Sequence, residues 1–135
     1  MTDYFTTQLK PDELQAISSI GLAHVGDAVY ELLVRTWLCR QGKATGRGLH
    51  RATVELVCAP KQAELCQVLQ PLLTQEEQEV LRRGRNANVH SIPRHASPGE
   101  YRQATALEAL FGWLWLQGRR QRLCELFEAA MGEVE

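Results

Sequence analysis

The 135-residue sequence has little net charge, because 15 Lys and Arg residues stand against 16 Asp and Glu residues and leave a charge of −1. Proteins that bind nucleic acid usually carry an excess of Lys and Arg, so the overall balance argues against such a partner unless the basic residues are clustered. The chain also has no room for a second module, since this length suits one hydrophobic core. We therefore expect a single domain over residues 1–135.

Long apolar runs are absent as well. The longest nearly uncharged apolar stretch covers about thirteen residues, 104–116, whereas a membrane-spanning helix needs roughly 20. The N-terminal segment has neither the basic start nor the apolar stretch of a secretory signal. We predict a cytoplasmic protein with no membrane partner.

The cysteines lack the spacing of a metal site or a redox motif. None of the four shares a Cys-x-x-Cys pattern, and none pairs with His at zinc-finger spacing. They are Cys39, Cys58, Cys66 and Cys124. We expect reduced thiols that act as small core residues.

Sustained strand-like alternation is also missing, and apolar residues instead recur at three- and four-residue steps nearly everywhere. This pattern predicts an all-α fold, with a Gly-rich break at 42–48 and a loop at 84–99. Capping boxes at Thr74 with Glu77 and at Ser97 with Glu100 mark two helix starts. The predicted helices cover residues 21–41, 49–58, 60–71, 74–83, 99–117 and 119–132.

One charged residue, Glu108, stands within the apolar window 104–116. A helix that is apolar on every face is normally buried. A buried carboxylate costs several kcal/mol unless it is paired, hydrogen-bonded or bound to a metal. Glu108 is therefore a candidate functional residue, and a structural Glu–Arg pair is the alternative interpretation.

A second acid, Asp27, lies near the start of the long predicted helix and directly follows Gly26. Asp is a poor helix former, so its place inside a helix needs a reason, and Gly26 would let a backbone or a ligand approach closely. Glu31 lies one turn further along the same face. A solvated helix face is the alternative interpretation of this window.

Together the two windows resemble the catalytic domain of the ribonuclease III family. The resemblance covers nearly the whole chain in matching order and spacing, through IGLAHVGDAVYE, LHRATVELVCAPKQAE, EEQEVLRRGRNA and YRQATALEALFGWLWL. In length the chain is similar to the short branch, Mini-ribonuclease III, which has no appended double-stranded-RNA-binding domain. The resemblance implies an all-α, ribonuclease III-like endonuclease domain of about seven helices.

In that family, acids from these two helices meet and hold a divalent metal ion. The resemblance therefore implies that Asp27 and Glu108 are catalytic residues that bind Mg²⁺, with Mn²⁺ as a substitute. Such cations take oxygen ligands, keep several waters, and lower the pKa of a bound water for attack on a phosphodiester.

The sequence departs from the long form of the family at three positions. Two further acids are replaced by Ala23 and Thr105, as in the short branch, which leaves the number of metal ions and their remaining ligands open. Glu31 is a candidate outer contributor to the site. His24 stands where the long form carries an aromatic residue at its dimer contact.

The basic residues are clustered in two acid-free stretches, one between Glu31 and Glu55 and the other between Glu79 and Glu100. Phosphate binding needs clustered Lys and Arg rather than a high net charge. In the family, the RRGRNA segment leads into a loop expected to contact RNA. The candidate RNA-binding residues are Lys43, Arg47, Arg51, Arg82, Arg83 and Arg85. Solvated arginines on helix faces are the alternative.

The resemblance implies an endoribonuclease, a phosphodiester hydrolase that acts as a homodimer and cuts double-stranded RNA. It suggests a role in maturing the ends of the large-subunit (23S) ribosomal RNA precursor, with a ribosomal protein on the substrate as a further partner. The aromatic residues available to the core or to a dimer interface are Trp37, Phe111, Trp113 and Trp115.

Two other functions are alternatives to this one. A catalytically inactive relative would bind structured RNA or the ribosome as a scaffold, but the retention of both Asp27 and Glu108 counts against it. A helix-turn-helix DNA-binding protein would give no reason for Glu108, and no short helix pair carries a basic recognition face.

Overall fold

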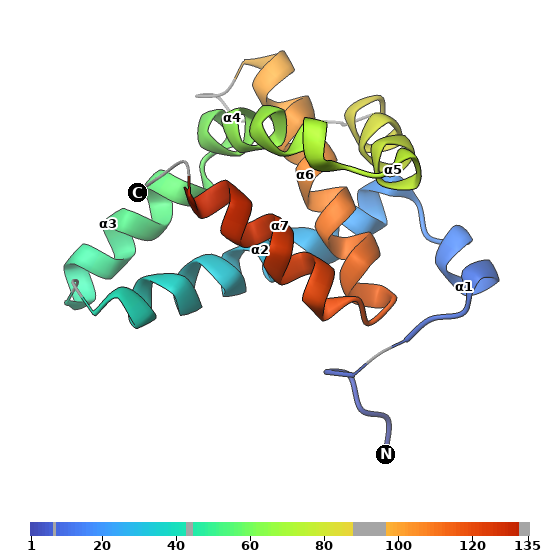
Figure 1. Cartoon of the computed structure of the whole chain (residues 1–135), viewed down its shortest axis with the longest axis horizontal. Coiled ribbons are helices and arrows are strands. Elements are labelled where there is room, and N and C mark those ends of the chain that lie inside the picture. The colour runs from blue at the N-terminus through green and yellow to red at the C-terminus, as the bar shows by residue number, and fades with distance from the viewer. Residues whose placement is uncertain (7, 43–44, 88–96, 133–135) are drawn as a thin grey trace.

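The computed structural model of the chain describes residues 1–6, 8–42, 45–87 and 97–132 (Figure 1). Within these ranges the chain forms seven α-helices and one 3₁₀ helix and contains no strand, which confirms the all-α prediction. No described helix is long and apolar enough to cross a membrane. Lys43 and most of the predicted loop, residues 88–96, lie outside the described residues.

The first two helices are α1 (Pro11–Gln15) and α2 (Ser19–Gln41). Ser18 caps α2, because its hydroxyl accepts a hydrogen bond from the Gly21 amide at 3.0 Å. This long helix was predicted, and it begins two residues earlier than expected. Helix α1 was not predicted, since five residues are too few to show an apolar period.

The next elements are α3 (Gly46–Val57), α4 (Ala59–Leu69) and the 3₁₀ helix η1 (Gln70–Leu72). Helix α3 begins inside the segment 42–48 that was predicted as a break, because glycine is tolerated in a first turn, where the amides have no intrahelical partner in any case. Helix α4 ends before Pro71, which lies in η1.

The last three helices are α5 (Gln75–Arg85), α6 (Pro98–Leu116) and α7 (Arg120–Gly132). Both predicted capping boxes are present, at the starts of α5 and α6. Helix α5 runs two residues beyond its predicted end at 83, so the predicted loop begins later than expected.

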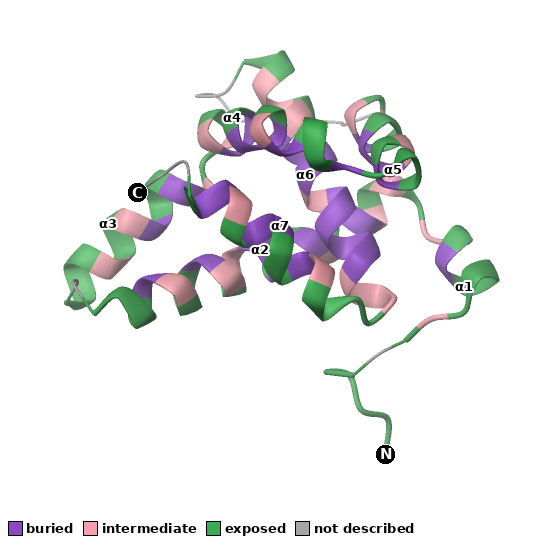
Figure 2. Ribbon diagram, in the orientation of Figure 1, coloured by how far each residue is buried: buried purple, intermediate pink, exposed green. Residues whose placement is uncertain are grey.

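Helix α6 is the centre of the fold, and α2, α4, α5 and α7 all pack against it. From Ala104 to Leu114 every residue of α6 is buried except Glu108, which is half-buried (Figure 2). The burial predicted for the window 104–116 is therefore confirmed over most of its length, and Glu108 is the exception within it.

The aromatic residues lie mainly in the core. Phe111 and Trp113 are buried, and Trp37 and Trp115 are half-buried against the same cluster. Phe111 meets the buried Tyr30 of α2 edge to face, with ring centroids 5.8 Å apart.

All four cysteines are free thiols, but their predicted place in the core is right only for Cys66. Burial raises the pKa of the Cys66 thiol to about 11. Cys39, Cys58 and Cys124 are exposed, because each falls on the outer side of its helix or at a helix junction. Counting Cys spacings cannot reveal this helical phase.

Candidate active site

Two glycines bring the backbones of α2 and α6 into contact. A Cβ atom on Gly26 would overlap the carbonyl oxygen of Glu108, and one on Gly112 would overlap the carbonyl oxygen of Leu22. Only glycine permits so close a helix crossing at both positions. Because Gly26 directly precedes Asp27 and lies against Glu108, this crossing places the two candidate acids side by side.

Asp27 is exposed and Glu108 is half-buried, and their side chains lie within hydrogen-bonding reach of each other. The pKa of Glu108 is raised to about 8, first because burial removes water from its carboxylate and second because the negative charge of Asp27 is close. A hydrogen bond to Asp27 favours the protonated form further, and one from Gln62 acts in the opposite direction. Near pH 7, with no cation bound, the Glu108 carboxyl group is therefore mostly protonated.

No Lys or Arg within the described part of the chain forms an ion pair with Asp27 or Glu108. The alternative of a structural Glu–Arg pair at Glu108 is therefore wrong for these residues. Asp27 is solvent-exposed, as the alternative of a solvated face expected, but it lies against a second acid.

The arrangement suits a hard divalent cation. Both groups offer carboxylate oxygens, and a cation between them would remove the repulsion that raises the pKa of Glu108. Among the described residues there is no group of three or more His, Cys, Asp or Glu side chains that could hold a metal. Mg²⁺ often binds through one or two carboxylates together with water and substrate phosphates, so the pair meets this requirement.

The C-terminal end of α3 is held near the acid pair by two side chains that were not predicted from the sequence. The Tyr30 hydroxyl donates to the Leu56 carbonyl at 2.7 Å, and Gln62 Nε2 donates to the Val57 carbonyl at 3.0 Å. These bonds satisfy carbonyls that the helix end would otherwise leave unpaired. Burial raises the pKa of Tyr30 well above its usual range, so its hydroxyl remains a donor.

A helical spacing pattern could have revealed Gln62. It lies three, four and seven residues before Leu65, Cys66 and Leu69, which are all buried on the same face of α4. A polar residue on an apolar stripe is the same signal that singled out Glu108.

The structure also describes the other residues singled out near the two acids. Glu31 forms an exposed ion pair with Arg35 at 3.1 Å, and its role as an outer contributor to the site stays a prediction. Ala23 and Thr105 are both buried, and the Thr105 hydroxyl donates to the Tyr101 carbonyl at 2.9 Å. His24 is exposed.

The predicted RNA-binding residues fall into two separate groups. Helices α3 and α5 lie toward opposite ends of the molecule's long axis (Figure 1), so the candidate arginines on these two helices do not form one cluster. Arg47 and Arg51 are exposed on α3 and form no ion pair within the described ranges.

The second group ends α5. Arg82 and Arg83 both pair with Glu79, at 2.6 and 3.3 Å, and these two guanidinium groups hold the pKa of Glu79 down to about 2. Arg85 is half-buried. The basic charge at this end is therefore partly neutralised by an acid on the same helix.

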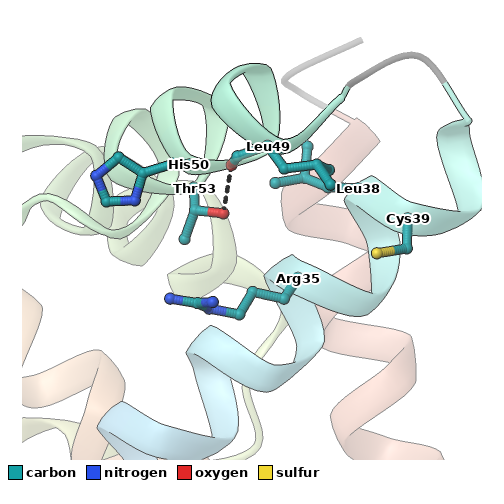
Figure 3. A pocket seen from close by; sticks show the side chains of 7 residues that line it. Arg35, Leu38, Cys39, Leu49, His50 and Thr53 are labelled. Carbon is teal, nitrogen blue, oxygen red and sulfur yellow. Dashed lines mark hydrogen bonds between the residues drawn. The ribbon is translucent and has the colours of Figure 1, made fainter.

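A hollow of about 180 Å³ lies between the C-terminal half of α2 and α3 (Figure 3). Arg35 extends along it beneath Thr53 and His50, and Leu38, Cys39 and Leu49 supply much of the remaining wall. Arg35 follows Asp27 by eight residues on α2, which corresponds to about 12 Å along the helix axis. The hollow is thus separate from the acid pair but lies on the same helix.

Comparison with known proteins places the chain in one family. Residues 21–119 match the Ribonuclease III domain family. Mini-ribonuclease 3 from Symbiobacterium thermophilum is 45% identical over 116 residues, which cover 86% of this chain and 89% of that protein. Mini-ribonuclease 3 from Thermoanaerobacter sp. is 37% identical over 96% of this chain and 92% of its own length.

The fold is also similar to a solved structure. A crystal structure of a protein from Fusobacterium nucleatum superposes with a TM-score of 0.77 at 28% identity, covering 82% of this chain and 90% of that one. These similarities support the predicted ribonuclease III-like fold and exclude the helix-turn-helix alternative.

Proposed function

We propose that this chain, which belongs to the ribonuclease III family and is an endoribonuclease, cleaves double-stranded RNA. The cleavage would be a metal-dependent hydrolysis at Asp27 and Glu108. One observation carries the assignment of the site. Two carboxylates are held together at a glycine-mediated helix crossing, where burial and the charge of Asp27 oppose the ionisation of Glu108. No described cationic side chain relieves that repulsion.

Asp27 and Glu108 would hold Mg²⁺, or Mn²⁺ in its place, and the bound cation would supply an activated water and stabilise charge on the leaving oxygen of the phosphodiester. The work of the chain is to present the two carboxylates in a fixed relation. Glu108 must release its proton for this, so cation binding and protonation compete at the site. The Gly26–Gly112 crossing fixes the positions of the two acids before the substrate arrives.

The basic residues at the two ends of the molecule suit an elongated polyanion better than a compact ligand. Duplex RNA is recognised mainly through its phosphates, 2′-hydroxyls and A-form shape. We assign phosphate contacts to Arg47 and Arg51 at one end, and to Arg82, Arg83 and Arg85 at the other. Lys43 stays a candidate from the sequence, outside the described residues.

We extend the proposal to the cellular role. The protein would act in the cytoplasm as a homodimer whose two sites each cut one strand. Its substrate would be the 23S ribosomal RNA precursor, whose ends it would mature, with a ribosomal protein on the substrate as a further partner. The support is the similarity to proteins named Mini-ribonuclease 3 over most of the chain.

A cleavage assay with isosteric variants tests the site. Wild type, Asp27→Asn and Glu108→Gln are incubated with a duplex RNA and Mg²⁺, and the expected loss in either variant is more than about 100-fold, since even outer partners of metal ligands cost 10–100-fold when removed. Asp12→Asn and Glu64→Gln are matched controls, because both acids are exposed and lie outside the site. Equal cleavage by wild type and both site variants would overturn the assignment.

A further inference from the structure

Gln62 on α4 is a buried polar side chain next to the candidate site. It is 1% exposed, its Nε2 donates to the Val57 carbonyl at 3.0 Å, and its side chain lies near enough to Glu108 to lower the pKa of that carboxyl group. Its Oε1 is the one buried side-chain nitrogen or oxygen, among the described residues, that has no hydrogen-bond partner.

The orientation of this amide follows from its partners. Rotating the amide by half a turn would bring Oε1 toward the Val57 carbonyl, which can only accept. The nitrogen must therefore face this carbonyl. Oε1 is bonded to the same carbon as Nε2, so it also lies near Glu108, and it has no donor.

Packing does not explain an amide at this position. Gln62 shares the buried face of α4 with Leu65 and Leu69, where an apolar side chain would fill the space without an unpaired oxygen. An unpaired buried acceptor costs about 1–3 kcal/mol. The bond to Val57 does not require burial either, because Gln78 Nε2 makes the same five-residue contact to the Leu73 carbonyl from an exposed position.

We propose that Gln62 is a positioning residue of the cation site: its amide nitrogen holds the Glu108 carboxylate, and its Oε1 accepts a hydrogen bond from a water of the hydrated cation. Mg²⁺ keeps several waters, and these need acceptors. Partners that orient metal ligands commonly tune metal affinity. The inference rests on the proposed function, because it requires a divalent cation at Asp27 and Glu108.

A nuclear magnetic resonance titration tests this in the unmodified chain. The side-chain amide signals of Gln62 are followed in ¹⁵N-labelled wild type as Mg²⁺ is added, with those of Gln78 as the internal control. The Gln62 signals are expected to shift along the same saturation curve as the backbone amide of Glu108, and those of Gln78 to stay fixed. Unmoved Gln62 signals at a saturated site would overturn the inference.

A matched pair of variants adds a second measurement. Gln62→Met removes the donor and the acceptor while keeping a similar volume, and Gln78→Met removes the equivalent backbone bond away from the site. Calorimetric titration with Mn²⁺ is expected to show affinity about 10-fold weaker for Gln62→Met and unchanged for Gln78→Met. Thermal unfolding of each variant separates lost affinity from lost folding, and the titration of wild type decides if Gln62→Met does not fold.

The outcomes separate the two proposals. Cation binding that is absent from wild type, or that persists in Asp27→Asn and Glu108→Gln, contradicts the proposed function itself. Binding that depends on both acids but is equally tight in folded Gln62→Met leaves the proposed function standing and removes the role of Gln62.

Discussion

Two glutamates, Glu77 and Glu108, are buried and half-buried, and the charged groups beside them have opposite signs. Glu77, on α5, is 0% exposed and receives hydrogen bonds from Arg122 Nε and Nη2 at 2.9 and 2.8 Å and from the Thr74 amide at 2.9 Å. Arg122 comes first among the groups that hold the pKa of Glu77 below its usual range. Glu108 has another acid beside it, and its pKa is raised to about 8.

The difference distinguishes a structural carboxylate from the one that we propose to be functional. The Glu77–Arg122 pair fastens α5 to α7, and Arg122 also donates to the Leu72 carbonyl at 2.9 Å, so the charges at this end are satisfied within the fold. The pair of Asp27 and Glu108 has no cationic partner among the described side chains. A buried acid that is paired with a cation of the same chain therefore indicates a structural role. An acid that lies against a second acid instead favours a binding site for a ligand.

The largest expected effect comes from breaking the ion pair between Glu77 and Arg122. Arg122→Met leaves Glu77 buried without its cation, which should lower the free energy of unfolding by about 3–5 kcal/mol. Chemical denaturation measures the change. Arg35→Met is the control, because the Arg35–Glu31 pair is largely exposed and should contribute less than about 1 kcal/mol. A loss below about 1 kcal/mol in Arg122→Met would show that the pair is not structural.

The next largest effect is expected at the crossing of α2 and α6, which brings Asp27 and Glu108 together. In Gly26→Ala the new Cβ overlaps the Glu108 carbonyl, so α2 and α6 must separate, with a loss of about 3 kcal/mol and loss of cleavage. Gly99→Ala is the control, because an added Cβ there meets nothing within 4 Å. Normal stability and cleavage in Gly26→Ala would mean that the close crossing is not needed to bring the acids together.

The sequence predicted the helices well because the apolar period and the caps are local signals. The capping boxes at Thr74 and Ser97 placed the starts of α5 and α6 to within one residue. The start of α3 was missed because the glycines at 46 and 48, which usually break a helix, are tolerated in its first turn. The five-residue α1 gave no period to detect.

The candidate site was predicted only as far as polarity within apolar patterns allowed. Glu108 stood out for that reason, and Asp27 became its partner through the family resemblance. Gln62 was missed although it breaks an apolar stripe in the same way, because an uncharged amide gives a weaker signal than a carboxylate. The separation of Arg47 from Arg85 could not be predicted, since it depends on tertiary packing, in which α3 lies against α2 and α4 while α5 lies against α6.

A smaller effect on stability, of opposite sign, is expected at Glu108, which has no cationic partner among the described residues. Without divalent cations, Glu108→Gln should raise the free energy of unfolding by about 2 kcal/mol at pH 8 and abolish cleavage, because it removes a charge that the folded state disfavours. In wild type, the pKa of Glu108 is raised from 4.5 to about 8 on folding, so the folded state binds more protons between these values and stability falls as pH rises.

The Glu108→Gln variant should lack this dependence of stability on pH. Its stability curve and that of wild type should therefore diverge from about pH 4.5 and run parallel above about pH 8. Glu77→Gln is the contrasting variant. The pKa of Glu77 is lowered on folding, so its contribution to stability is present above its unfolded pKa and is lost as pH falls. A Glu108→Gln protein less stable than wild type at pH 8 would place Glu108 with the structural acids.

The smallest effect is the most direct test of the comparison. At a Mg²⁺ concentration equal to its Kd, ligand binding to the folded state adds about 0.4 kcal/mol to the free energy of unfolding, and the gain grows with concentration. Wild type and Arg122→Met should both show it, because the Glu77 pair lies outside the site, whereas Asp27→Asn and Glu108→Gln should not. Paired denaturation curves with Mg²⁺ or with NaCl of equal ionic strength measure it. A gain in stability that persists in Glu108→Gln would mean that the cation binds elsewhere. The repulsion between Asp27 and Glu108 would then not indicate a cation site.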